Sequence, residues 1–156
     1  MNKDLQIAKK TVQTEIKGLK KLLSSFNRIS NFSKAVNLLS KMKGKCLVVG
    51  VGKSYLVSLK VSATLSSLGT PSVAFSANDL QHGGLGAIQK NNDILLIFSV
   101  SGESSELDSI LRYANRHKVL VIGVSCKSNS MLLRYSTIKI ILPKVVEAGH
   151  SLAPTA

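Results

Sequence analysis

The segment Ser99–Ser104 gathers hydroxyl side chains in a pattern that suits phosphate binding. It reads Ser-Val-Ser-Gly-Glu-Ser and follows one of the most apolar runs of the chain. Hydroxyls that alternate with backbone amides can bind a phosphate group without carrying charge. Ser104 alone has an ordinary alternative, because serine is a preferred N-cap residue for a helix that follows it. That alternative leaves Ser99 and Ser101 unexplained, so the segment predicts a phosphate-binding loop.

Three of the eight acidic residues lie where chemistry is expected. Glu103 and Glu106 adjoin the serines, where a carboxylate would repel a phosphate dianion. We therefore expect them to orient a hydroxyl or to transfer a proton. Glu147 follows the last strand-like run, a position that suits a general base. As an isolated acid Glu147 would mean little, so its assignment depends on the other motifs.

A second glycine-containing segment, Gly50–Ser54, reads Gly-Val-Gly-Lys-Ser and joins an apolar run to a helical pattern. A nucleotide phosphate loop would need glycine in place of Leu47, and a dinucleotide fingerprint would need glycine in place of Tyr55, so both motifs are excluded. What remains is a tight turn at a helix N-terminus, where anions are stabilised, with Lys53 and Ser54 beside it. The alternative is a structural turn whose glycines serve only the backbone.

A third segment, Asp79–Gly86, contains His82 and three glycines. His82 can titrate near neutral pH, although a single loop histidine is also compatible with a structural or merely exposed role. No second His or Cys stands at metal-ligand spacing, so no metal site is predicted. His117 lies between Arg116 and Lys118 and is interpreted as the solvated end of a helix.

From Lys45 onward, short apolar runs alternate with helical patterns. The runs lack the polar alternation of half-exposed strands, so we expect strands buried on both faces of a parallel sheet. The order predicts an α/β three-layer α-β-α sandwich with a five-stranded parallel sheet, in which a ligand binds beyond the carboxyl ends of the strands. The expected strands are 46–50, 71–76, 93–99, 119–125 and 137–142, and the expected helical segments between them are 54–68, 104–116 and 130–135.

Residues 4–42 have helical spacing of apolar side chains, with a break near Ser30-Asn31 and a stop at Gly44. We expect two domains or segments: N-terminal helices over 1–43 that pack on the core, and the α/β domain over 44–156. Most of the positive charge lies in the N-terminal segment. It is interpreted as a lysine-rich solvated helix face, with nucleic acid or an acidic partner as the weaker alternative.

Composition excludes several protein classes. The chain has 156 residues, is 44% hydrophobic and carries a formal net charge of +13, which excludes a disordered tail but would attract anions non-specifically. Aromatic residues make up 4% and tryptophan is absent, so nucleic-acid binding is not expected. No apolar run is long enough for a membrane helix and no secretory signal is visible. Cys46 and Cys126 lie in apolar runs and are interpreted as reduced, buried residues, so a cytoplasmic location is expected.

Taken together, these motifs resemble the sugar isomerase (SIS) domain, and within it the bacterial arabinose-5-phosphate isomerases. The resemblance covers roughly residues 35–156. Those enzymes interconvert D-arabinose 5-phosphate and D-ribulose 5-phosphate through a cis-enediol, for the lipopolysaccharide sugar Kdo. The matching stretches are 50–54, 68–72, 82–86, 101–106, Glu147 and 152–155.

The resemblance implies a role for each matching residue. Lys53, Glu106 and Glu147 would be catalytic, with Glu147 as the base and Lys53 as the donor to the enediolate oxygen. No cofactor is required by this chemistry, and a homo-oligomer is expected because SIS domains usually associate. Sugar-phosphate binding would involve Ser54, Gly69, Thr70, His82, Ser99, Ser101, Glu103 and Ser104.

Two positions depart from the family pattern. Ser76 stands where family members often carry a histidine that binds inhibitory zinc, which argues further against a metal. The sequence ends at Ala156, whereas the family continues with another helix, a His-Pro-Gly-Gly segment and usually two CBS modules. The expected α/β domain is therefore incomplete at its C-terminus, with apolar sheet surface uncovered. The alternative function is a non-catalytic phosphosugar-binding SIS module, decayed or regulatory.

Overall fold

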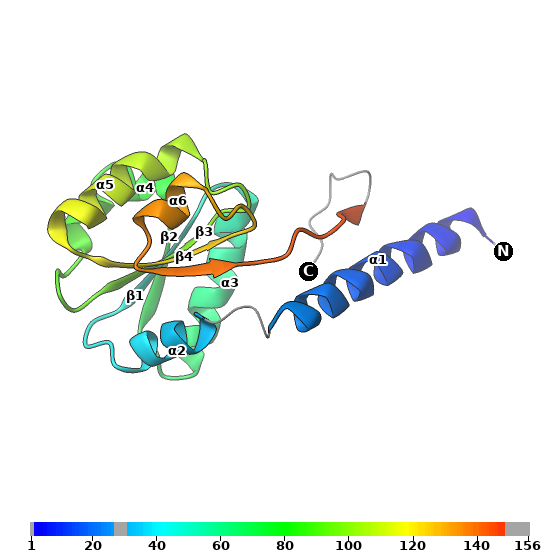
Figure 1. The fold of residues 1–156 in the computed structure, drawn as a ribbon, viewed down its shortest axis with the longest axis horizontal. Helices are drawn as coiled ribbons and strands as arrows, with labels where there is room; N and C mark the ends of the chain where they lie inside the picture. Colours follow the sequence, from blue (N-terminus) through cyan, green and yellow to red (C-terminus); the bar gives the residue numbers. More distant parts are fainter. Residues whose placement is uncertain (1, 27–30, 149–156) are drawn as a thin grey trace. The chain divides into compact units, whose positions relative to one another are not determined.

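The computed structural model describes residues 2–26 and 31–148 (Figure 1). The chain divides into two compact units. One comprises Met1–Ser30 with Leu142–Ala156, and the other comprises Asn31–Ile141. This division differs from the expected boundary at residue 43, because helix α2 (Phe32–Ser40) belongs to the same unit as the sheet.

The larger unit is built on a five-stranded parallel sheet in the order β2-β1-β3-β4-β5. All four strand pairs are parallel, which confirms the predicted α/β architecture. The central strands are buried on both faces because both faces carry helices, so their sequences show no polar alternation. The strands are β1 (Cys46–Gly50), β2 (Ser72–Ser76), β3 (Ile94–Phe98), β4 (Leu120–Ser125) and β5 (Ile138–Ile141).

The helices that connect these strands occupy the predicted stretches with small shifts at their ends. The segment between β2 and β3 differs, because it was expected to be a loop and contains two short helices. The helices are α3 (Lys53–Ser67), α4 (Ala77–Gln81), the 3-10 turn η2 (Gly84–Ala87), the 3-10 turn η3 (Ser105–Leu107), α5 (Asp108–His117) and α6 (Met131–Tyr135).

The main hydrophobic core lies between the sheet and the layer of α4, α5 and α6. Leu47, Leu95 and Val121 project from the strands into this core, where they join Ile110 and Leu111 of α5. Figure 1 shows α4, α5 and α6 together on one side of the sheet, with α3 on the other side.

Helix α3 packs on the sheet through serines rather than through its leucines. Ser58 and Ser62 are buried, whereas Leu56 and Leu59 of the same helix are 63% and 44% exposed. A Cβ at Gly50 would lie only 2.5 Å from the backbone of Ser54, so the start of the helix comes very close to β1. Small side chains are needed for this approach, which is why the apolar spacing in α3 does not mark its buried face.

The smaller unit contains α1 (Lys3–Ser25) and the segment from Leu142 to Ala148. Asn2 caps α1 by accepting a hydrogen bond from the Asp4 N–H, and Lys21 Nζ donates to the Lys144 carbonyl at 2.6 Å. The apolar side chains of α1 are largely exposed within the described chain, among them Leu5, Val12, Ile16, Leu19 and Leu23. Over the described residues, neither α1 nor any other helix combines the length and apolar character needed to cross a membrane.

The two cysteines differ in their surroundings. Cys46 is fully buried, and burial together with the nearby Asp93 carboxylate raises the pKa of its thiol to about 12. Cys126 is half-buried, which is less than the sequence analysis expected. Neither forms a disulfide.

Candidate functional site

Three of the segments singled out in the sequence meet at the carboxyl edge of the sheet. The ends of β2, β1, β3 and β4 are neighbours across the sheet, with Ser76 beside Gly50, Gly50 beside Phe98, and Phe98 beside Val124, the residue before the last in β4. The connections that leave these strands therefore begin side by side. The parallel topology alone brings together segments that are up to about fifty positions apart in the chain.

The loop that follows β3 is ordered by its own serines. Ser99 is buried, and its Oγ accepts a hydrogen bond of 3.0 Å from the Gly102 N–H and lies 3.4 Å from Ser104 Oγ. Ser101 is exposed, and its Oγ accepts from the Glu103 N–H at 3.2 Å. Ser99 thus supports the loop from inside, and its expected contact with phosphate stays a prediction. Ser101 and the half-buried Ser104 are the hydroxyls nearer to solvent.

Gly102 closes this loop onto the start of α6. Its φ of +64° lies in the left-handed region, and a Cβ would stand 2.4 Å from Ser130 Oγ. The Gly102 carbonyl accepts a hydrogen bond from the Leu132 N–H, and Ser130 caps α6 by accepting from the Leu133 N–H. Glycine is required at this position both by the backbone and by the close contact.

Glu103 is paired and does not stand as a free negative charge beside the serines. Its carboxylate accepts from Lys127 Nζ at 2.7 Å and from the Met131 N–H at 3.3 Å. The hydrogen bonds from Lys127 and Met131 hold the pKa of Glu103 below its ordinary value. The pair links the loop after β3 to the loop after β4. Sequence reasoning missed Lys127, because nothing in the local pattern connects positions that lie 24 residues apart.

The turn after β1 presents the N-terminus of α3 at the same edge. Gly52 has a φ of +54° and precedes Lys53, the first residue of the helix. Lys53 is exposed and Ser54 is half-buried. A helix of 15 residues offers a partial positive charge at its N-terminus, so this end of α3 favours an anion.

The segment after β2 contacts η3, the 3-10 turn that follows the serine loop. The Gln81 side chain donates a hydrogen bond from Nε2 to the Glu106 carbonyl, which ties α4 to η3. His82 follows α4 as its C-cap residue and is exposed. The Glu106 carboxylate accepts from Ser105 Oγ at 3.3 Å. Lys53, Ser54, His82, Ser101, Ser104 and Glu106 therefore all belong to segments at one edge.

Two predicted substrate-binding residues lie at the other edge. Gly69 and Thr70 connect α3 to the beginning of β2, and the Thr70 N–H donates to the Leu65 carbonyl. The adjacent Pro71 carbonyl accepts from the N–H of Cys46, the first residue of β1. A strand of five residues spans on the order of 16 Å, so a single chain does not bring this pair together with the serines.

Glu147 is not among the residues that the sheet unit collects, because it belongs to the unit formed with α1. Ser76 stands where related sequences often carry a histidine. Its side chain caps α4 by accepting a hydrogen bond from the Asp79 N–H. Within the described part of the chain, no group of three or more His, Cys, Asp or Glu side chains is placed to hold a metal ion.

Known proteins with similar sequences include several arabinose 5-phosphate isomerases. The chain is 34% identical over 151 residues to arabinose 5-phosphate isomerase KdsD of Yersinia pestis, covering 96% of this chain and 45% of that protein. It is 32% identical over 149 residues to an uncharacterized protein, RP505, of Rickettsia prowazekii, covering 96% and 46%. The chain thus spans about half the length of these curated relatives.

Solved structures extend the likeness to the fold. An Escherichia coli CFT073 protein, c3406, in complex with arabinose 5-phosphate superposes with a TM-score of 0.91 at 28% identity, covering 99% of this chain and 82% of that one. A structure described as a putative sugar-phosphate isomerase from Listeria monocytogenes superposes with a TM-score of 0.84 at 25% identity, covering 97% and 81%. The SIS domain model matches residues 38–156. The strand order, the serine-rich loop after β3 and this match agree, and the chain belongs to the SIS domain family.

Proposed function

We propose that the chain binds a sugar phosphate at the carboxyl edge of the sheet and acts as an aldose–ketose isomerase on D-arabinose 5-phosphate and D-ribulose 5-phosphate. The observation that carries this proposal is the convergence of the serine loop, the start of α3 and the Lys53 ammonium at one edge. The relatives named arabinose 5-phosphate isomerase and the neighbour in complex with that sugar phosphate support the choice of ligand.

The charge distribution at this edge suits a phosphate group. Ser101 and Ser104 supply hydroxyls near solvent, and the N-terminus of α3 supplies a partial positive charge. The ion pair with Lys127 neutralises Glu103, so its carboxylate repels a bound dianion less than an unpaired one would. The preorganised loop also lowers the entropy lost on binding, because Ser99 and Gly102 already hold its backbone in place.

The proposed reaction moves one proton between two adjacent carbons. A base removes the proton from C2 of the open-chain aldose, the released electron pair forms the C1–C2 double bond, and O1 gains a proton to give a cis-enediol. Loss of the O2 proton and return of a proton to C1 then yield the ketose. We assign Glu147 as the base, Lys53 as the donor to the enediolate oxygen and Glu106 as the group that relays hydroxyl protons. No step needs a redox cofactor.

The substrate-facing assignments of His82, Gly69 and Thr70 remain part of this proposal. Because Gly69 and Thr70 lie at the amino edge, they reach a substrate only where a second copy adjoins the first. A homo-oligomer is therefore part of the proposal, and the molar mass of the purified chain in solution measures it directly. In bacteria that make lipopolysaccharide, such an activity would supply the precursor of Kdo.

A non-catalytic phosphosugar-binding module is the second candidate. One observation favours it: the sheet unit by itself collects groups for phosphate but not Glu147. The two candidates share the binding site and differ only in proton transfer.

Proton exchange distinguishes the two candidates. The purified chain is incubated with arabinose 5-phosphate in deuterium oxide, and the C2 proton signal is followed by NMR while calorimetry measures binding. The isomerase predicts loss of that signal and appearance of ribulose 5-phosphate, whereas the binding module predicts heat without exchange. Absence of both would contradict both candidates.

A matched pair of variants locates the site. Ser101→Ala with Ser104→Ala should weaken arabinose 5-phosphate binding about tenfold, because two hydroxyl contacts to a charged group are removed. Ser109→Ala, an exposed serine on α5, is the control and should leave the affinity unchanged. Equal effects of the two changes would place the ligand elsewhere.

A further inference from the structure

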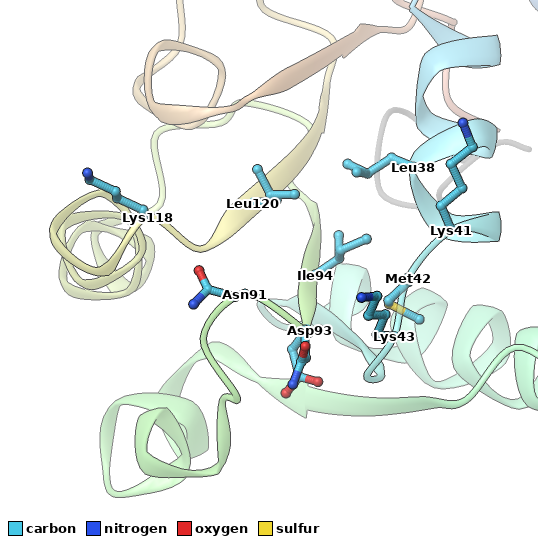
Figure 2. Close-up of a pocket in the computed structure, with 10 residues that line it drawn as sticks. Leu38, Lys41, Met42, Lys43, Asn91, Asp93, Ile94, Lys118 and Leu120 are labelled. Carbon is cyan, nitrogen blue, oxygen red and sulfur yellow. The ribbon is translucent and has the colours of Figure 1, made fainter.

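A cavity lies at the amino edge of the sheet, opposite the site described above. Its volume is about 310 Å³, and it opens between the starts of β3 and β4 and the end of α2. Figure 2 shows Ile94 and Leu120, the first residues of these two strands, with Leu38 of α2 facing them. None of the predicted site residues lines this cavity, and the proposed reaction does not involve it.

Three lysines border the cavity from two sides. Lys41 and Lys43 come from the end of α2 and the segment after it, and Lys118 comes from the end of α5. In Figure 2 the apolar side chains of Leu38 and Leu120 lie between them. None of the three lysines forms an ion pair with a carboxylate in the described part of the chain.

The carboxylate of Asp93, which lines this cavity, is already paired with groups of the protein. Its side chain has no exposed surface, and its oxygens accept from Lys45 Nζ, from the Lys45 N–H and from the Gln89 N–H, each at 2.8 Å. Asp93 thus neutralises Lys45 and leaves the charges of the bordering lysines uncompensated.

Helix dipoles reduce this positive charge but do not cancel it. The C-termini of α2 and α5 both point to this edge, and each contributes roughly half a negative charge. Three lysines against two such ends leave about two positive charges. Lys90 and Arg116 add to the same region, since partial burial and these two charges lower the pKa of His117 at the end of α5.

The cavity combines this charge with an apolar floor and side-chain amides. Leu38, Ile94 and Leu120 form the floor, and Leu120 is 39% exposed although it begins a central strand. Asn91 and Asn92 supply donors and acceptors beside the floor. An apolar surface does not help to bind a bare phosphate, but it stabilises the flat face of a ring. The volume lies at the lower end of small-molecule sites, which begin at about 300 Å³.

We propose that the cavity at the amino edge binds a nucleoside phosphate, with the ring on Leu38, Ile94 and Leu120, the phosphates on the side of Lys41 and Lys43, and Lys118 adding positive charge from the other side. Asn91 and Asn92 line the same cavity, and in this proposal their amides bind the polar edges of the base. This site is separate from the carboxyl edge and does not depend on the isomerase proposal.

Calorimetry with ADP tests the proposal on the full chain at low and at physiological salt. ADP is expected to bind one site per chain, and Lys43→Glu with Lys118→Glu should weaken it at least tenfold. The matched control reverses two exposed lysines elsewhere, Lys34→Glu with Lys60→Glu, and should change the affinity less than twofold. Lys43→Met is a milder variant that keeps the test usable if the charge reversals reduce folding.

Two competing ligands separate the possible outcomes. Saturating arabinose 5-phosphate should leave ADP binding unchanged, because no residue assigned to the sugar phosphate lines the cavity. Inorganic pyrophosphate should bind at least tenfold more weakly than ADP, because it lacks a ring. The proposal is overturned if ADP does not bind, if both lysine pairs weaken it equally, if the sugar phosphate displaces it, or if pyrophosphate binds as well as ADP.

Discussion

The two edges of the sheet favour anions by different means. At the carboxyl edge, hydroxyls and a helix N-terminus provide partial positive charge, and the acid Glu103 is held by Lys127. At the amino edge, the full positive charges of lysines border the cavity. Its acidic residue, Asp93, is buried and forms an ion pair with Lys45. Helix polarity explains part of the difference, because acids suit the first turns of helices and bases suit the last turns.

This comparison separates two kinds of selectivity. A site made of fixed hydroxyls and backbone dipoles depends on geometry, so it is sensitive to small backbone shifts. A site made of surface lysines depends on net charge, so it is sensitive to salt and to charge reversal.

The largest effect is expected at the closure of the serine loop. Gly102→Ala should lower the free energy of unfolding by about 3 kcal/mol, because the left-handed backbone and the contact with Ser130 both penalise a Cβ. Gly52→Ala is the matched control: its φ is also positive, but a Cβ there meets nothing within 4 Å, so the loss should be about 1 kcal/mol. Urea denaturation measures both. Equal losses would show that the contact with Ser130 contributes nothing.

A smaller effect is expected at the buried acid of the amino edge. Asp93→Asn should lower the free energy of unfolding by about 2 kcal/mol at pH 7, because it removes the charge that pairs with Lys45. Burial acts to raise the pKa of Asp93, but the hydrogen bonds from Lys45 and Gln89 outweigh it, so the pKa lies below its ordinary value.

The sign of this pKa shift sets the pH dependence. A carboxyl group whose folded pKa is depressed contributes stability above its unfolded pKa, near about 4, and loses it as the pH falls through the folded pKa. The difference in stability between the wild type and Asp93→Asn should therefore shrink from about pH 5 to about pH 2. Thermal unfolding over that range measures it, and a constant difference would contradict the assignment.

At the carboxyl edge, the ion pair between Glu103 and Lys127 should matter for affinity. Lys127→Met should weaken arabinose 5-phosphate about fivefold, because it leaves the Glu103 carboxylate unpaired beside the phosphate. Adding Glu103→Gln to this variant should restore most of the lost affinity for arabinose 5-phosphate. ADP binding at the other edge should be unaffected by either change, and calorimetry reports all three values. Failure of the double variant to recover affinity would mean that Lys127 touches the ligand itself.

The smallest effect is expected at the end of α5. Lys118 has a φ of +55°, so Lys118→Gly should raise the free energy of unfolding by about 0.5 kcal/mol. The same change removes one cation from the cavity and should weaken ADP about threefold. Asn91→Gly, with a φ of +68°, relieves similar strain and is a control for stability only, because Asn91 lines the same cavity. Unchanged ADP binding in Lys118→Gly would contradict the part given to the Lys118 charge.

Residue type and spacing alone predicted the sheet and the segments at its carboxyl edge. Continuous apolar runs such as Leu47–Val49 indicate strands covered on both faces, and that requirement implies parallel pairing with helical connections. The helices between β2 and β3 were missed because five residues of α4, capped by Ser76, are too short to show a helical period.

Other features depended on which elements become neighbours in space. The spacing of Leu56 and Leu59 indicates a helix, but only the close approach at Gly50 shows that serines, not leucines, face the sheet. The pairing of Glu103 with Lys127, and the hollow bordered by Lys43 and Lys118, arise because β4 lies next to β3. The elements and their order could be predicted from local periodicity, because strands and helices differ in the spacing of their apolar residues. Which charges are neutralised, and which are available to a ligand, could be found only in the folded chain, because charge pairing depends on distances that no local pattern contains.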